Sequence, residues 1–286
     1  MNYIDKVFYK DASDMSEIPS ASIDLVITSP PYFNIKDYSL DGKQTKAHSG
    51  KARAQLGDLG DYKVFIKSLL TIWKECERVL APNGKLIINS PLMPMEKNKY
   101  STHHNRHIFD INADIQNSIL YRRNTRLFLY DVYIWNRSNT AKSLMFGSYP
   151  YPRNFYAQNT SEFITVYVKD GLPRNNLPDR IKKASKLTQK EWVELTKQIW
   201  TIPIPNRNDI AFGKHSAIMP EEIVRRCIKL FTFVDDTVLD PFAGSGTTLK
   251  VACEMGRRIV GYEIVKSYRE IINKKIELAR KKKCNE

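Results

Sequence analysis

Short apolar runs recur along the chain, separated by stretches in which apolar residues return every three or four positions. The runs predict seven β-strands, at residues 4–9, 23–28, 85–89, 127–135, 162–168, 237–239 and 258–262. Between the second and third strands, helical spacing extends over residues 62–80 and ends at a Pro-Asn-Gly turn. Strands that alternate with helices predict an α/β fold with one large, mostly parallel sheet.

Two stretches break this alternation. Residues 34–61 are polar and contain four glycines, which predicts a long mobile loop. Residues 170–208 combine prolines, many basic residues and two tryptophans, which is typical of an inserted recognition element. A solvated helical excursion explains the same composition equally well.

The charge of the chain favours a polyanionic partner. Lys and Arg number 45 and Asp and Glu 31, a net charge of +14, which favours nucleic acid over anionic lipid or a basic surface that serves only solubility. No apolar run reaches the ~18 residues of a membrane span, the first residues lack a signal peptide, and the four cysteines form no CxxC pair. We therefore expect a cytoplasmic protein without a membrane segment.

The most informative segment joins the sixth strand to a helix and reads Asp240-Pro-Phe-Ala-Gly-Ser-Gly-Thr247. Gly244 and Gly246 allow the backbone to approach a ligand closely, and the N–H groups at the start of the following helix can bind a carboxylate or phosphate. A phosphate-binding loop is disfavoured because the turn lacks a lysine and a third glycine and begins with an acid.

Two further acids are expected near this turn. Glu263 follows the last strand, where ribose hydroxyls lie in doubly wound folds, and Asp11 follows the first. Carboxylates around a pocket suit a cationic ligand, and S-adenosylmethionine fits because it carries a sulfonium, an ammonium and a carboxylate but no phosphate. The alternative is a helix-capping loop with solvent-facing acids.

A second turn follows strand 23–28 and reads Thr28-Ser-Pro-Pro-Tyr32. Pro30 and Pro31 stiffen its backbone. Ser29 Oγ and the Pro30 carbonyl can accept hydrogen bonds from an exocyclic amino group, while Tyr32 offers a flat face to an extruded base. Such acceptors favour the tetrahedral nitrogen that develops as a methyl group arrives, so no covalent enzyme intermediate is required.

At these two turns the sequence resembles the β-class amino-methylating DNA methyltransferases. The Ser-Pro-Pro-Tyr turn is similar to the family's catalytic motif and the glycine turn to its S-adenosylmethionine motif, and the catalytic motif comes first, as in that class. Glu263 resembles the ribose-binding acid and Asp11 the acid near the adenine. The segment with His215 and Ser216 resembles the one that closes over methionine, although Ser216 replaces the usual proline.

This resemblance implies a set of site residues. The catalytic residues would be Ser29, Pro30, Pro31 and Tyr32, and the cofactor-binding residues Asp11, Thr28, His215, Ser216, Asp240, Pro241, Phe242, Gly244, Ser245, Gly246, Thr247 and Glu263. Phosphate contacts are expected from the basic residues Arg174, Arg180, Lys182, Lys183, Lys186 and Lys190.

The resemblance also implies an architecture and a role. The sheet would be a seven-stranded, Rossmann-like methyltransferase sheet with a reversed final strand. Residues 1–169 would form the catalytic half, 170–208 the target recognition region and 209–286 the cofactor-binding half. The implied activity is site-specific methylation of duplex DNA after base flipping, in a restriction-modification system with a cognate endonuclease, by a monomer or homodimer.

The choice of base depends on Ser29. In this family a serine before Pro-Pro usually accompanies cytosine N4, and an acid or amide accompanies adenine N6, so we expect cytosine and keep adenine as the alternative. RNA or a protein amide is a further possible acceptor. A nucleotide-binding oxidoreductase would leave the Ser-Pro-Pro-Tyr turn unexplained, and a DNA-binding protein without catalysis would not need a cofactor turn.

Three histidines, His103, His104 and His107, lie close together and suggest a metal site. Neutral histidines in a loop near the cleft explain the pattern better, because direct methyl transfer requires no metal. We therefore expect no metal cofactor.

Overall fold

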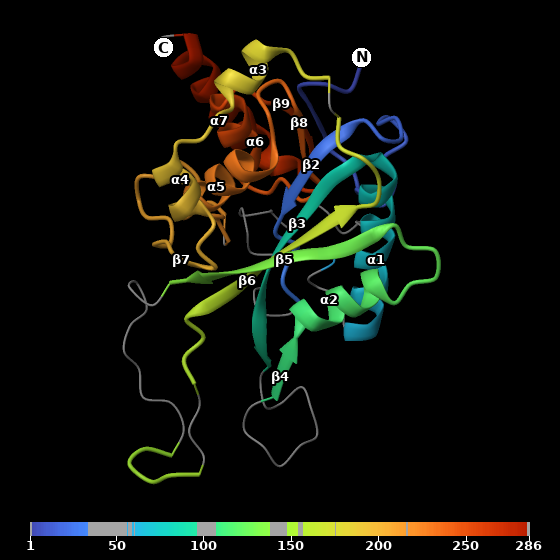
Figure 1. Cartoon of the computed structure of the whole chain (residues 1–286). Helices are drawn as coiled ribbons and strands as arrows, with labels where there is room; N and C mark the ends of the chain where they lie inside the picture. The colour runs from blue at the N-terminus through green and yellow to red at the C-terminus, as the bar shows by residue number, and fades with distance from the viewer. Residues whose placement is uncertain are drawn as a thin grey trace.

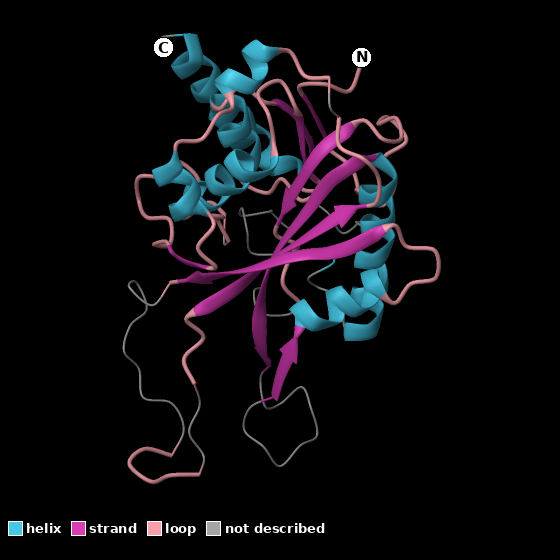
Figure 2. Cartoon of the chain, in the orientation of Figure 1, coloured by secondary structure: helices cyan, strands magenta, loops and turns pink. Residues whose placement is uncertain are grey.

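The computed structural model describes residues 2–33, 56, 59, 61–95, 107–137, 148–153, 157–174, 176–215 and 217–284. In this part of the chain a single mixed sheet runs through the molecule and helices cover both of its faces (Figures 1 and 2). The loop predicted at 34–61 falls outside the described residues except for positions 56, 59 and 61.

The sheet order differs strongly from the chain order. From one edge to the other the strands are β1 (Lys6–Phe8), β9 (Arg258–Tyr262), β8 (Thr237–Asp240), β2 (Ile23–Thr28), β3 (Leu80–Met95), β6 (Ser161–Lys169), β5 (Leu127–Asn136) and β7 (Ile199–Thr201), while β4 (His107–Asp110) pairs with the far end of β3. Strand β2 pairs in parallel with β3 and β8, which places Leu25 opposite Lys85 and Val238. The turns after β2 and β8 therefore leave the sheet at the same edge.

All seven predicted strands are present, and the prediction of an α/β fold is confirmed. The sheet has two more strands than predicted, because β4 and β7 have only four and three residues and are too short to show an alternating pattern. Strand β6 runs antiparallel to both β3 and β5. On the path from β1 to β7 it is the reversed strand, and β4 also runs antiparallel to β3. Strands β7, β8 and β9 follow β6 in the chain, so the reversed strand is not the final one.

The side chains of β2 show why two helical layers form. Leu25 and Ile27 belong to a buried cluster with α5 (Glu221–Phe231), α6 (Thr247–Glu254) and α7 (Arg269–Cys284). Val26 points to the other face and joins a cluster with α1 (Tyr62–Val79) and α2 (Ile111–Leu120). Because consecutive side chains of a strand alternate between faces, a continuously apolar strand must be covered on both sides.

Helix α1 begins and ends close to the predicted bounds of 62–80. Its N-cap is Asp61, whose carboxylate accepts hydrogen bonds from the backbone N–H groups of Lys63 and Val64. This satisfies two of the donors that a helix leaves unpaired at its start.

The described positions of residues 170–208 belong to the α/β body. Helices α3 (Asp179–Ala184) and α4 (Gln189–Leu195) lead to the edge strand β7. Trp200 of β7 is 1% exposed and stacks on Tyr133 of β5 with ring centroids 4.5 Å apart. At least the second half of this segment therefore contributes to the core and is not a solvated excursion.

None of the helices in the described ranges combines the length and the apolar character that crossing a membrane requires.

The two tryptophans of this segment provide a matched test of its packing. Trp200→Ala should lower the free energy of unfolding by about 3–5 kcal/mol, because it empties a buried aromatic site. Trp192, on the surface of α4, is 61% exposed, so Trp192→Ala should change the same quantity by less than ~0.5 kcal/mol. Urea denaturation measures both, and equal small effects would show that the segment is not part of the core.

Candidate active site

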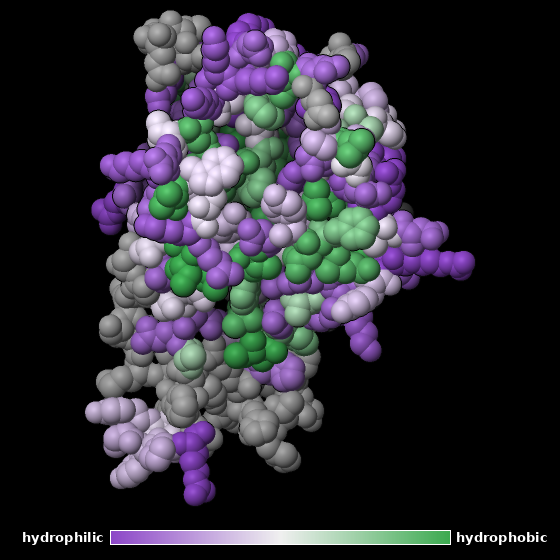
Figure 3. All heavy atoms as spheres, viewed as in Figure 1, coloured by the Kyte–Doolittle hydropathy of each residue, from purple (hydrophilic) through white to green (hydrophobic). Residues whose placement is uncertain are grey.

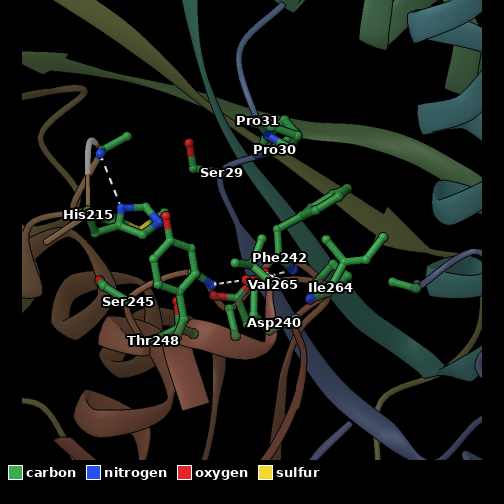
Figure 4. A pocket seen from close by; sticks show the side chains of 18 of the residues that line it. Ser29, Pro30, Pro31, His215, Asp240, Phe242, Ser245, Thr248, Ile264 and Val265 are labelled. Carbon is green, nitrogen blue, oxygen red and sulfur yellow. Dashed lines mark hydrogen bonds between the residues drawn. The ribbon is translucent and has the colours of Figure 1, made fainter. Parts of the chain in front are cut away.

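A pocket lies at the carboxyl ends of the parallel strands, where the turns after β1, β2, β8 and β9 converge. Figure 4 shows Ser29 and the two prolines on one side of the pocket and Ser245 and Thr248 on the other. Most of the predicted site residues line it, namely Asp11, Ser29, Pro30, Pro31, Tyr32, His215, Asp240, Pro241, Phe242, Gly244, Ser245, Thr247 and Glu263. The two turns identified in the sequence thus form one site.

The Ser-Pro-Pro-Tyr turn and the glycine turn are joined by a direct hydrogen bond. Thr28 Oγ1 donates to Asp240 Oδ1 at 2.7 Å, and the backbone N–H of Phe242 donates to the same oxygen at 3.0 Å. Burial raises the pKa of Asp240 to about 6. Because this carboxylate oxygen is occupied by protein donors, Thr28 and Asp240 fix the turns relative to each other.

Glu263 closes the glycine turn from the next strand. Its two oxygens accept hydrogen bonds from the backbone N–H groups of Gly244 and Val265, each at 2.7 Å. Burial raises the pKa of this carboxyl to about 7, although both N–H groups oppose the shift. The ionised form of this acid supplies the negative charge that suits a cationic or hydroxyl-bearing ligand.

The geometry of the turn requires glycine at two positions. Gly244 has φ +50°, and a Cβ there would lie 2.9 Å from His215 Nε2. Gly246 has φ +80°, and a Cβ there would lie 3.2 Å from the Cα of Ile272 in α7. The turn is therefore compressed between the His215 segment and α7, and α6 begins immediately after it at Thr247.

His215 covers the glycine turn. Its ring lies 4.8 Å from that of Tyr268, and its Nδ1 accepts a hydrogen bond from the backbone N–H of Ala217 at 3.1 Å (Figure 4). Ser216, predicted from the resemblance to bind the cofactor, lies outside the described residues.

Asp11 lies at the pocket edge after β1, as expected from its position. It accepts a hydrogen bond from the backbone N–H of Ser13 at 2.8 Å, so it also stabilises its own turn. Its neighbour Lys10, which also lines the pocket, pairs with Glu17 at 2.8 Å.

The Ser-Pro-Pro-Tyr turn is held by an acid that sequence reasoning missed. Ser29 Oγ donates to Tyr32 Oη at 3.2 Å, and Tyr32 Oη donates to Glu162 Oε2 at 2.9 Å. Glu162, on β6, is 3% exposed and also binds Asn89 Nδ2 at 2.7 Å and Arg137 Nη1 at 2.9 Å. In the sequence, the signal for Glu162 was a single acid at the start of an otherwise apolar strand.

The basic residues predicted to contact phosphates are not brought to the pocket. Arg174 pairs with Asp24 at the start of β2, and Arg180 lies 3.8 Å from Asp235, which precedes β8. Both acids mark the amino ends of the parallel strands, opposite the pocket. Figures 1 and 3 show α3 and a concentration of hydrophilic side chains at that end of the molecule. The remaining predicted contacts, Lys182, Lys183, Lys186 and Lys190, lie on α3, after it and at the start of α4.

The histidine cluster is described only in part, because His103 and His104 lie outside the described residues. His107 begins β4 and contacts the ring of Phe109 edge-on, with centroids 5.2 Å apart. Among the described residues no group of three potential metal ligands is present.

Comparison with known proteins identifies the same family from both sequence and structure. Residues 23–274 match the N6/N4 family model described as DNA methylase. The Type II methyltransferase M.MjaI of Methanocaldococcus jannaschii is 31% identical over 97% of this chain and 92% of its own length. M.MthZI of Methanothermobacter thermautotrophicus, also a Type II methyltransferase, is 28% identical over 95% of this chain and 76% of its own.

Among solved structures, the fold is similar to TTHA0409 of Thermus thermophilus, a candidate DNA modification methylase solved in complex with S-adenosyl-L-methionine. The TM-score is 0.70, at 27% identity and over 96% of this chain and 95% of that one. PvuII DNA methyltransferase, which is cytosine-N4-specific, has the same fold with a TM-score of 0.61, at 18% identity and over 95% and 92% of the two chains. The cofactor of this chain is therefore S-adenosyl-L-methionine.

The raised pKa of Glu263 predicts that cofactor affinity depends on pH. If the ionised form binds, the dissociation constant for S-adenosylmethionine should rise about fourfold between pH 8 and pH 6.5, as protonation removes the charge. This range lies above the pKa of about 6 expected for Asp240. Isothermal titration calorimetry without DNA measures the effect.

Glu263→Gln is the control for this prediction. It should bind the cofactor more weakly at pH 8 and should lose the dependence over this range. A wild-type affinity that is constant with pH, or a dependence that persists in Glu263→Gln, would contradict the assignment.

Proposed function

The chain belongs to the N6/N4 DNA methylase family, and from that premise we propose that it transfers a methyl group from S-adenosylmethionine to N4 of cytosine in duplex DNA. The transfer is direct and in line, and the target base is turned out of the helix to reach the pocket.

The observation that supports this proposal is the shared pocket. Ser29 and Tyr32 line the same pocket as Asp240, Gly244 and Glu263, so a methyl donor held by the glycine turn lies next to the hydrogen-bond acceptors of the catalytic turn. Ser29 donates its own hydrogen to Tyr32, which leaves the lone pairs of Ser29 Oγ available to an incoming amino group. Fixed acceptors favour the nitrogen geometry of the transition state.

Tyr32 is positioned to stack on an extruded base. Its hydroxyl is fixed by Glu162, which Asn89 and Arg137 hold in turn. A preorganised ring reduces the entropy cost of placing the base against Ser29.

The choice of cytosine rests on Ser29, with adenine N6 as the second candidate. The serine agrees with the expectation for cytosine N4, and the PvuII enzyme is described as cytosine-N4-specific. In favour of adenine, YhdJ of Escherichia coli, described as a DNA adenine methyltransferase, is 25% identical over 96% of this chain. Both reactions would use the same pocket.

The duplex must lie over the carboxyl ends of the strands, because the base has to reach Ser29. Within 170–208, the part that approaches this edge begins at β7, which pairs with the end of β5, and continues to the exposed Arg207. We therefore assign target recognition to residues 199–208 and the loops beside them, and assign the cluster from Arg174 to Lys190 no base-reading role. The Type II relatives support a role in a restriction-modification system with a separate endonuclease.

Ser29→Ala should separate catalysis from cofactor binding. Loss of one transition-state acceptor should lower kcat about 100-fold or more, while the dissociation constant for S-adenosylmethionine stays within about twofold because the glycine turn is intact. Equal loss of cofactor binding would contradict the assigned role.

The same assay identifies the base. Duplex DNA is incubated with methyl-labelled S-adenosylmethionine, digested to nucleosides and analysed by mass spectrometry. N4-methylcytosine is the expected product. Detection of N6-methyladenine would show that adenine is the methylated base, and no transfer to DNA would overturn the proposed function.

Substitutions of Tyr32 test the stacking role. Tyr32→Ala should reduce base flipping and turnover by ~10- to 100-fold, because base–aromatic stacking contributes about 1–3 kcal/mol. Tyr32→Phe keeps the ring and loses the hydrogen bonds that the hydroxyl makes with Ser29, Asn89 and Glu162, so its loss of turnover should stay below about tenfold. Fluorescence of 2-aminopurine at the target position measures flipping, and equal losses in both variants would argue against stacking.

A further inference from the structure

Helix α7 places one lysine against the back of the glycine turn. Lys275 is 1% exposed, whereas Lys274 beside it lies on the exposed face of the helix. Ile272 lies one turn earlier in α7. A Cβ added to Gly246 would lie 3.2 Å from the Cα of Ile272, so the turn or the helix would have to shift. The buried side of α7 thus forms the support of the turn, and a buried cation there requires compensating partners.

Those partners come from the turn and from the segment that carries His215. Lys275 Nζ lies 3.0 Å from Asp209 Oδ1, 3.0 Å from Thr247 Oγ1 and 3.4 Å from Ser245 Oγ. Burial lowers the pKa of Lys275, and the Asp209 carboxylate opposes that shift. The ammonium has three N–H donors, and one carboxylate and two hydroxyls accept them.

The donor count determines how the two hydroxyls are oriented. Ser245 Oγ and Thr247 Oγ1 both accept from Lys275, and they lie 3.2 Å from each other. One hydroxyl hydrogen therefore bridges the pair, and the other remains for a third partner. Ser245 and Thr247 line the pocket while Lys275 does not, so that hydrogen is available to a ligand in the pocket.

The pocket lining consequently carries groups of both charges. Asp240 and Glu263 supply carboxylates. At the end of the pocket formed by the start of α6 at Thr247, the N–H groups of the first helical turn have the Lys275 charge behind them. A carboxylate is the anionic group of S-adenosylmethionine, and it matches this second end.

The ion pair of Lys275 with Asp209 also connects the glycine turn to His215. Asp209 Oδ1 accepts from the backbone N–H of Ala211 at 2.8 Å, and the Ala211 carbonyl accepts from the N–H of His215 at 3.0 Å. A displacement of Asp209 would therefore be transmitted to the residue that covers Gly244.

We propose that Lys275 is a positioning residue for the carboxylate of S-adenosylmethionine: it orients the hydroxyls of Ser245 and Thr247 toward that group and, through Asp209, holds the His215 segment over the turn. The proposal concerns cofactor binding without DNA and does not depend on the base that is methylated. A product of N6-methyladenine would change the base assigned in the proposed function, and no transfer to DNA would overturn that function; either result would leave this inference intact.

The test compares S-adenosylmethionine with decarboxylated S-adenosylmethionine, which lacks only the carboxylate, by calorimetry on the full chain. In Lys275→Met the affinity for S-adenosylmethionine should fall ~10- to 100-fold, as expected for a charge-assisted network. The affinity for the decarboxylated ligand should change less than about twofold, because this ligand has no carboxylate to contact the start of α6. Lys274→Met, the exposed neighbour, should leave both affinities unchanged.

Two further measurements keep the test decisive. Asp209→Asn/Lys275→Met removes both charges and leaves no unpaired buried ion, and it should show the same selective loss if the single variant does not fold. In the wild-type protein, S-adenosylmethionine should bind at least ~10-fold more tightly than the decarboxylated ligand. Equal wild-type affinities, or equal losses for both ligands in a folded variant, would overturn the proposal.

Discussion

The site depends on the parallel pairing of β2 with β8. These strands are more than 200 residues apart in the chain, and their pairing brings the Ser-Pro-Pro-Tyr turn and the glycine turn to one edge of the sheet. The hydrogen bond from Thr28 to Asp240 then sets the distance between them. In the reaction that we propose, the methyl donor and the acceptor nitrogen must lie in line, and this pairing is what brings the two turns into one pocket.

The sequence predicted those parts of the fold and site whose signal is local. Apolar runs located seven strands, and prolines, glycines and an acid at a strand end located both turns, since these residues restrict the backbone where they occur. The short strand β7 carried no such pattern, because its place in the sheet comes from pairing with only three residues of β5.

Residues that act through distant contacts could not be found in this way. Glu162 is one acid at the start of a strand, and its contact with Tyr32 spans 130 positions. Lys274 and Lys275 are adjacent residues of the same type, and the sequence does not show that Lys275 is buried while Lys274 is exposed. Composition also cannot tell the two edges of a sheet apart. Arg174 and Arg180 were expected to contact phosphates, and they pair with acids at the amino ends of the strands, away from the pocket.

The sheet order determines when, during synthesis, the pocket can form. Strand β8, the partner of β2 and the carrier of the glycine turn, emerges from the ribosome about 210 residues after β2. At ordinary rates of synthesis that separation is roughly 10–40 seconds. Throughout this interval the nascent chain lacks Asp240, which accepts the hydrogen bond from Thr28, so a ribosome-bound fragment cannot assemble the pocket before β8 has been synthesised.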